Sequence, residues 1–453
     1  MAEPTAKEQL DPQAQLDRLA GLAQDVLARC RARGASQADV VLDLDRGLAV
    51  NVRLGEVETV EYTRDRGLSL TVYFGQRKGS ASTADLAPAS LEATVEQACA
   101  IAKLTEEDPA AGLAEAELMA TEFPDFDQWH PWGLDAEHAI ALAVACEQAG
   151  READPRIDNS EGAAVNTNES LSVYANTHGF VGRERSTSHS LSCSLIAGKG
   201  SAMQRDYWYT SALAAEDLEP AAAVGRRAAE RAVARLSPRQ VKTGEYPVLY
   251  APEVARSLIG HLLGAVSGGA LYRRASFLLD QAGQRIFPAW MNIVEKPHLR
   301  RGFRSAAFDG EGVATREQDL VRDGVLVRYV LGSYSARKLG LKTTGNAGGI
   351  HNLVVETGEY GFDELVQRMG RGLVVTELMG QGVNTVTGDY SRGAAGFWVE
   401  NGEIVHPVDE LTIAGNLRDM FQRIEAVGRD VDRRSHILTG SILVGRMTVA
   451  GAA

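Results

Sequence analysis

The sequence predicts an α+β fold, in which two N-terminal helix–sheet–helix units are followed by a mostly antiparallel β-rich C-terminal domain. Twice before residue 239, a helical repeat of apolar residues is followed by strand-like alternation and then by a second helix. After residue 239, short apolar runs alternate with glycine-containing turns. At about 150 residues per domain, a chain of 453 residues suggests about three domains. We place them at residues 1–120, 121–238 and 239–453.

The first unit opens with a helix over residues 12–33. Leu16 and Leu19 belong to its apolar stripe, and Gly34 is a natural C-terminal stop. A second helix over residues 90–103 closes the unit. The strands expected between the two helices are residues 40–42, 48–54, 57–62 and 68–74.

The second unit follows an acidic, irregular stretch at residues 105–131, which marks a domain boundary. It repeats the layout of the first unit, with helices over residues 135–151 and 219–236. The strands expected between these helices are residues 163–166, 171–175, 180–183, 188–195 and 203–209.

The C-terminal domain begins with a strand at residues 245–250 and a helix at residues 252–266. The dipeptides Asp323-Gly324 and Asn401-Gly402 each separate two apolar runs, which is a strong signal for a β-hairpin. We expect one further helix, over residues 362–369, so that this domain holds two helices in all.

Composition excludes several classes of partner. Asp and Glu outnumber Lys and Arg by 60 to 47, and the formal net charge is -13. Sequence-independent binding to nucleic acid or to an anionic membrane needs a basic surface, so we expect neither partner. The longest uncharged apolar-rich run, residues 257–272, is shorter than the ~18–20 residues of a membrane-spanning helix.

Compartment and redox state follow from similar observations. The N-terminus lacks the apolar stretch of a signal peptide, so a cytoplasmic location is expected. The four cysteines, at positions 30, 99, 146 and 193, have no close spacing. This pattern indicates reduced, mostly buried thiols.

Local catalytic motifs are absent from the sequence. No two of the nine histidines lie three to five residues apart, so there is no local pair of metal ligands. There is no Gly-x-Ser-x-Gly nucleophile motif, and the glycine-rich runs lack the Lys-Ser or Lys-Thr of a phosphate-binding loop. Distant histidines and carboxylates remain free to converge in space.

Three stretches are unusual, and each has two readings. Residues 260–277 combine a small, uncharged helix end with two arginines. Either this stretch faces a cavity or a partner, or it is a buried helix followed by an arginine pair in solvent. Residues 342–353 form either a backbone-rich loop that holds an extended peptide or an ordinary loop. In residues 380–393, Asp389 and Arg392 are either contact residues or a pair across a turn. The candidate substrate or partner contacts are His261, Arg273, Arg274, Asn346, His351, Asp389 and Arg392.

These stretches carry a family resemblance. Residues 260–279, 345–351, 377–404 and 411–417 resemble the PmbA (also called TldE) branch of the TldD/PmbA family, and the resemblance extends over essentially the whole chain. It implies a cytoplasmic, heterodimeric zinc metalloprotease that acts on unfolded or leader peptides. In that family the TldD-like subunit carries a His-Glu-x-x-x-His motif and a late Cys, which together bind zinc, and the motif Glu is the general base.

This sequence departs from that motif. If His261 is aligned with the first motif His, Leu262 replaces the Glu and Val266 replaces the second His. If the arginine pair is the anchor instead, His261 falls on the Glu and Ala265 falls on the second His. The last cysteine is Cys193, so the late Cys is missing too. Leu, Val and Ala side chains bind no zinc, so we expect no cofactor in this chain and zinc in a TldD-like partner.

The resemblance therefore implies a non-metal-binding subunit that is inactive alone. It would pair with a TldD-like subunit and help to enclose an extended peptide substrate. When alone, the chain is expected to form a homodimer through its C-terminal domain, because half of a split assembly exposes strand edges. Two alternatives stay open: a non-enzymatic regulatory binding protein, similar to a DNA gyrase modulator, and an independent hydrolase that uses distant carboxylates and histidines.

Overall fold

The structure is a computed structural model and describes residues 11–451. Its N-terminal half is built on one six-stranded antiparallel sheet with the strand order β3-β2-β1-β4-β5-β6. The strands are β1 (Gln37–Arg53), β2 (Glu56–Phe74), β3 (Arg77–Thr83), β4 (Ile157–Asn176), β5 (Val181–Ala197) and β6 (Gln204–Ala212). The two predicted N-terminal units share this sheet, because β1 of the first pairs with β4 of the second from Asp39↔Asn176 to Val52↔Ala163.

The strands of this sheet are longer than the sequence predicts. The runs expected at 57–62 and 68–74 are parts of the single strand β2, and the pairs expected in β1, β4 and β5 merge in the same way. The polar residues between the runs continue the ladder to β1 without interruption, since backbone hydrogen bonding does not depend on side-chain polarity. Residues 56–66 of β2 are exposed, so no alternation marks them as a strand.

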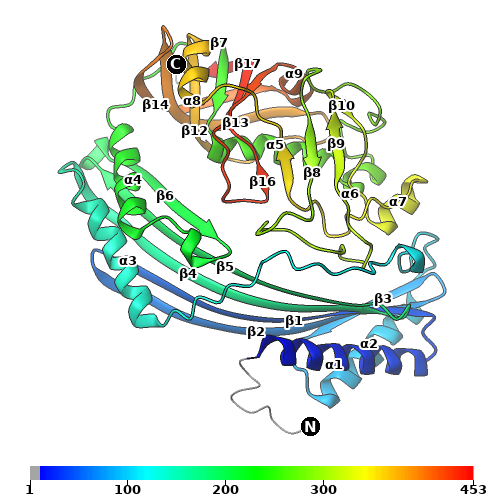
Figure 1. Cartoon of the computed structure of the whole chain (residues 1–453). Helices are drawn as coiled ribbons and strands as arrows, with labels where there is room; N and C mark the ends of the chain where they lie inside the picture. Colours follow the sequence, from blue (N-terminus) through cyan, green and yellow to red (C-terminus); the bar gives the residue numbers. More distant parts are fainter. Residues whose placement is uncertain (1–10, 452–453) are drawn as a thin grey trace.

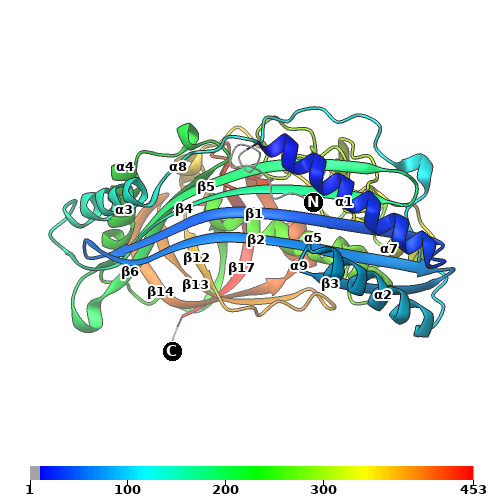
Figure 2. The same cartoon turned by 90° about the horizontal axis from the view of Figure 1, so that it is seen from below.

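Four helices cover the outer, convex face of the sheet (Figures 1 and 2). They are α1 (Pro12–Ala32), α2 (Pro88–Leu104), α3 (Ala136–Arg151) and α4 (Ala221–Ala234). Helices α1 and α2 pack on residues such as Leu42, Leu70 and Val173, whereas α3 and α4 pack on the other half of the same face. The carboxylates of Asp11 and Asp135 cap α1 and α3, and both helices begin within one residue of the positions that the sequence predicted.

The C-terminal domain lies against the inner, concave side of the sheet (Figure 1). It contains a six-stranded sheet of order β14-β13-β12-β7-β17-β15 and a five-stranded sheet of order β10-β9-β8-β11-β16. Pairing is antiparallel except for β7–β12 and β11–β16. The strands are β7 (Gly244–Tyr250), β8 (Ile293–Glu295), β9 (Gln318–Arg322), β10 (Val325–Leu326), β11 (Leu353–Val355), β12 (Gly372–Met379), β13 (Asp389–Glu400), β14 (Glu403–Asn416), β15 (Ile424–Val427), β16 (Ile437–Leu438) and β17 (Ile442–Ala450).

The helices of this domain only partly match the prediction. Helices α5 (Pro252–Val266) and α8 (Phe362–Met369) lie where the sequence placed them, and both hairpins form at the predicted dipeptides. Three further helices were missed: α6 (Gly268–Tyr272), α7 (Ser333–Leu339) and α9 (Leu417–Gln422). They have five to seven residues, which is too short for a helical repeat to be recognised.

The irregular stretch between the two N-terminal units is held against the C-terminal domain. Asp127 pairs with Arg300 and Arg301, and the Arg337 guanidinium donates to the carbonyl groups of Ala110, Gly112 and Leu113. The four cysteines are buried and unpaired, as predicted. Within residues 11–451, no helix is long and apolar enough to cross a membrane.

Candidate functional site

Helix α5 places His261 at the edge of the C-terminal core. Its neighbours Leu258 and Leu262 are fully buried in that core. The opposite side of α5 carries Gly260 and Gly264, and a Cβ added at either glycine would meet no atom within 4 Å. His261 is therefore half-buried, with open space beside it along the helix.

Strand β13 brings Arg392, one of the predicted contact residues, and its neighbour Tyr390 next to α5. Tyr390 and Arg392 are two positions apart on a strand, so their side chains share one face of the sheet. The Tyr390 ring lies edge-on to the His261 ring, with 5.8 Å between the centroids. The Tyr250 hydroxyl, at the end of β7, donates to the Tyr390 hydroxyl at 3.4 Å. Burial lowers the pKa of His261, and the nearby positive charge of Arg392 lowers it further.

Both basic side chains lack polar partners. His261 Nε2 and Arg392 Nε are buried, and neither has a hydrogen-bond partner among residues 11–451. The interpretation in which Asp389 pairs with Arg392 is wrong. Asp389 accepts hydrogen bonds from Thr387 Oγ1 at 2.6 Å and Asn416 Nδ2 at 3.1 Å. Residues three apart on a strand point to opposite faces, so the two side chains diverge.

A second group of predicted residues surrounds a buried carboxylate that the sequence analysis missed. Glu295 Oε1 accepts hydrogen bonds from Asn346 Nδ2 at 2.8 Å and from the His351 backbone NH at 2.9 Å. It also accepts one from His351 Nδ1 at 2.8 Å. Glu295 Oε2 accepts from Arg328 at 2.6 Å, and Arg328 also donates to Asn346 Oδ1 at 3.0 Å. The loop expected at residues 342–353 is thus fixed by hydrogen bonds from Asn346 and His351 to the buried Glu295 carboxylate.

This hydrogen bonding sets the charge state of the group. Burial alone would raise the pKa of Glu295, but the hydrogen bonds from His351 and the charge of Arg328 outweigh burial and lower it. An ionised carboxylate only accepts hydrogen bonds, so His351 Nδ1 carries the proton. The one sequence signal for Glu295 is a carboxylate that ends an apolar strand, which is too common a pattern to single out.

The inner face of the N-terminal sheet contributes carboxylates toward this loop. Glu184 on β5 lies near His351, whose charge favours the ionised form. Burial of the carboxyl group by the surrounding protein nevertheless raises the pKa of Glu184 to about 7, although part of the residue's surface remains exposed.

Arg273 and Arg274 belong to neither group. Both are exposed just after α6, and Arg273 stacks over the Tyr272 ring with 5.3 Å to its centroid. The exposure of the pair agrees with the interpretation of a solvated arginine pair, and the contact role of Arg273 and Arg274 stays a prediction.

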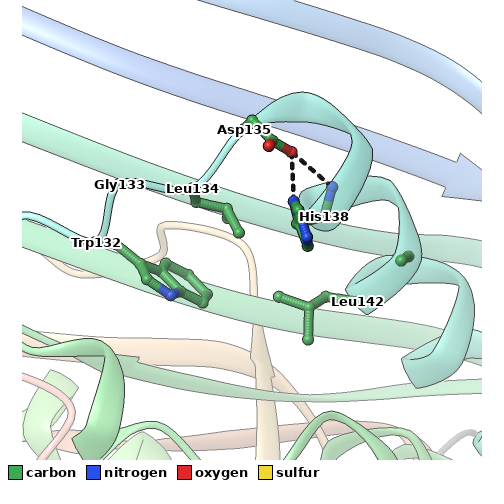
Figure 3. Close-up of a pocket in the computed structure, with 7 residues that line it drawn as sticks. Trp132, Gly133, Leu134, Asp135, His138 and Leu142 are labelled. Atoms are coloured by element: carbon green, nitrogen blue, oxygen red, sulfur yellow. Dashed lines mark hydrogen bonds and ion pairs between the residues drawn. The ribbon is translucent and has the colours of Figure 1, made fainter.

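Two pockets lie outside these groups. One, of about 550 Å³, opens at the start of α3 and is lined by Trp132, Gly133, Leu134, Asp135, His138, Ala141 and Leu142 (Figure 3). Its polar pair is explained by helix capping, because Asp135 accepts from both the backbone NH and the ring of His138. The other, of about 300 Å³, lies on β1, β4, β5 and β6, where Asn51, Glu161, Ser194 and Arg205 contribute polar groups.

The donor set on α5 does not fit a zinc ion. In either motif register the positions of the missing ligands are taken by Leu262, Ala265 and Val266, which are fully buried among apolar side chains. His261 would remain as a single ligand, and zinc sites need three or four. Within the part of the chain that the structure describes, no three His, Cys, Asp or Glu side chains gather as a metal site.

Family models match most of the chain. They are described as PmbA/TldA metallopeptidase domain 1, central domain and C-terminal domain, and they match residues 38–102, 129–236 and 243–451. Among curated proteins, the metalloprotease PmbA of Escherichia coli O157:H7 is 50% identical over 414 residues, covering 91% of this chain and 92% of that protein. The PmbA homolog of Haemophilus influenzae is 47% identical and covers 92% and 93%.

Solved structures share the whole fold. A protein of Bacteroides thetaiotaomicron, named a "putative modulator of DNA gyrase", superposes with a TM-score of 0.91 at 29% identity, over 96% of this chain and 99% of that one. A protein of Thermotoga maritima with a similar name gives 0.86 at 26% identity, over 95% and 100%. TldE of Thermococcus kodakarensis superposes with a TM-score of 0.84 at 20% identity, over 95% of this chain and 100% of that one. At this low identity the similarity shows the fold alone.

Proposed function

The chain belongs to the PmbA/TldD metallopeptidase family, on its PmbA (TldE) branch, and we propose that it is the non-metal-binding subunit of a heterodimeric zinc metalloprotease. A TldD-like subunit would supply the zinc and the general base. The substrates would be unfolded or leader peptides. The observation that carries the proposal is the apolar replacement of the motif residues, since Leu262 and Val266 are buried in the core with no ligand atom to offer.

The inner face of the N-terminal sheet supports a role in holding an extended peptide. Alternate residues of β5 that point away from the helices are Ser186, Ser188, Ser190, Ser192 and Ser194. The facing positions of β4 include Asn166 and Asn168. Hydroxyl and amide groups can exchange hydrogen bonds with a peptide backbone whatever its sequence, which suits a subunit that receives unfolded chains.

The test is an activity assay with separated and mixed subunits. Alone, this chain should not cleave an unfolded peptide above background, and with a TldD-like subunit it should yield more activity than either chain alone. Replacing the partner's motif Glu by Ala removes the general base and should reduce activity ~100- to 10,000-fold. His261→Ala in this chain removes neither base nor zinc ligand and should cost far less.

The opposite results would overturn the proposal. A loss from His261→Ala as large as that from the partner's Glu variant, in a folded and assembled protein, would show catalytic machinery in this subunit. Full activity of the partner without this chain would instead favour a regulatory binding role, which the names of the Bacteroides and Thermotoga structures also suggest. The net charge of -13 argues against direct contact with DNA in that role.

A further inference from the structure

We propose that His261 and Arg392 form a binding site for a carboxylate group, on the face of the C-terminal domain where α5 meets β13. The sequence offered both residues as substrate or partner contacts without indicating what chemical group they would bind. The identification of the ligand as part of a peptide rests on the proposed function.

The first observation is the absence of partners for two strong donors. Burying a hydrogen-bonding nitrogen without a partner costs free energy, and native proteins keep very few such groups. Here two of them, His261 Nε2 and Arg392 Nε, come from different elements and lie within electrostatic reach of each other. A ligand that accepts hydrogen bonds would satisfy both.

The second observation is an uncompensated positive charge. Other buried arginines of this protein have carboxylate partners: Arg328 pairs with Glu295 at 2.6 Å and Arg434 with Asp432 at 2.9 Å. Arg392 forms no ion pair with any residue between 11 and 451. The missing counter-charge is therefore an anion from outside the chain.

The third observation is access. Gly264 follows His261 by three residues, so both lie on the same side of α5, and no atom comes within 4 Å of a Cβ built there. His261 and Arg392 each keep part of their surface exposed. The buried Tyr250 and Tyr390 side chains bind each other through their hydroxyls. A ligand group can thus enter from the glycine side.

The chemistry of the two donors favours a carboxylate. A guanidinium binds a carboxylate through two parallel hydrogen bonds, and the imidazole adds a third donor when protonated. The lowered pKa of His261 means that an anion bound beside it would promote proton uptake. Affinity should therefore rise as the pH falls toward the pKa of His261. In a peptide, the carboxylate is either the C-terminus or an Asp or Glu side chain.

The test uses the isolated full-length chain and three fluorescent unfolded peptides, with binding measured by anisotropy. The first peptide has a free C-terminal carboxylate and no Asp or Glu. The second is its C-terminal amide, and the third is the amide with one internal Glu. We expect a carboxylate to strengthen binding about 10- to 100-fold over the plain amide. Whichever of the first and third peptides binds more tightly identifies the source of the carboxylate.

Variants show whether the preference comes from this site. Arg392→Gln should abolish the preference for the carboxylate peptides, Arg392→Lys should retain part of it, and His261→Gln should reduce it and remove its pH dependence. Arg273→Gln, which removes an exposed arginine, should leave the preference unchanged. Thermal unfolding of each variant checks that it is folded.

Equal binding of the three peptides, or no binding, would overturn the proposal. A preference that survives Arg392→Gln would overturn it as well. No cleavage is measured, so the result stands apart from the mixed-subunit assay. If that assay fails while the carboxylate preference persists, the proposed function falls and the binding site remains.

Discussion

At the scale of single residues, the inner face of the N-terminal sheet holds carboxylates in surroundings that resist their ionisation. Asp39 on β1 is the clearest case. Burial raises its pKa from 3.8 to about 7, Lys78 partly opposes this shift, and the charge of Glu311 from the C-terminal domain adds to it. Ionisation of Asp39 at neutral pH therefore lowers the free energy of unfolding.

This cost of ionisation predicts how stability depends on pH. The folded-state pKa of Asp39 is raised above the unfolded value, so its ionisation costs nothing below about pH 3.8. The cost grows between pH 3.8 and about 7, and then stays constant. The Asp39→Asn variant should therefore gain about 2–4 kcal/mol of unfolding free energy relative to the native chain across this window.

Denaturant midpoints measured from pH 4 to pH 8 test this prediction. Asp45→Asn, on the same strand and the same face, is the matched control for replacing a carboxyl group by an amide. A constant difference between Asp39→Asn and the native chain at every pH would mean that Asp39 titrates at an ordinary pKa.

At the scale of elements, helices α3 and α4 cross at two glycines. A Cβ at Gly225 would lie 1.9 Å from the Cys146 carbonyl oxygen, and one at Gly150 would lie 2.6 Å from the Gly225 carbonyl oxygen. Such distances are far inside van der Waals contact, so the glycines set how closely the two helices approach.

Gly225→Ala should therefore destabilise the protein by about 1–3 kcal/mol, because the helices must separate and the packing against the sheet loosens. The matched control is Gly21→Ala in α1, where a Cβ meets nothing within 4 Å. There the lower backbone entropy cost of Ala should stabilise the protein by about 0.5–1 kcal/mol. Thermal unfolding of both variants gives the comparison. An equal gain from the two substitutions would show that the crossing is not tight.

At the scale of the whole molecule, the first prediction concerns metal content. Since the motif positions on α5 hold apolar side chains, chain purified without an affinity tag should contain far less than one zinc per molecule, as measured by elemental analysis. One tightly held zinc that resists mild chelation would contradict this and would show that distant histidines converge.

The second whole-molecule prediction concerns self-association. In the C-terminal sheet, β14 pairs with β13 along one edge and with β17 at residues 412–414 of the other. Within residues 11–451 no strand pairs with this second edge at the start of β14, where Ile404 and Val405 are 46% and 49% exposed. Open strand edges tend to pair, so we expect the isolated chain to form a homodimer through this domain. Ile404→Lys should weaken the dimer in sedimentation experiments at tens of micromolar protein.

The control for this prediction lies on the other sheet. Val57 is 46% exposed on the open part of β2, which β3 does not reach, and Val57→Lys introduces the same charge there. If Val57→Lys weakens the dimer and Ile404→Lys does not, the contact runs through the N-terminal sheet. A strict monomer of the native chain would contradict self-association altogether.

The elements that could be predicted are those whose signals are local. Helices α1, α3 and α5 have apolar repeats and clear ends, and the hairpins at Asp323-Gly324 and Asn401-Gly402 depend on turn residues alone. The short helices α6 and α9 could not be found in this way, because their stability comes from packing against the core and not from their own sequence.

The sequence by itself determined the α+β class, the family branch and the lack of a zinc motif, because each depends on which side chains occupy neighbouring positions. Only the tertiary structure decided that β1 and β4 join two units in one sheet, and that Glu295 lies behind Asn346 and His351. The tertiary structure also decided that Arg392 lies beside His261, and that Asp389 binds Asn416 and not Arg392. These contacts join residues far apart in the chain, and they form where strand register and the packing of α5 bring their faces together.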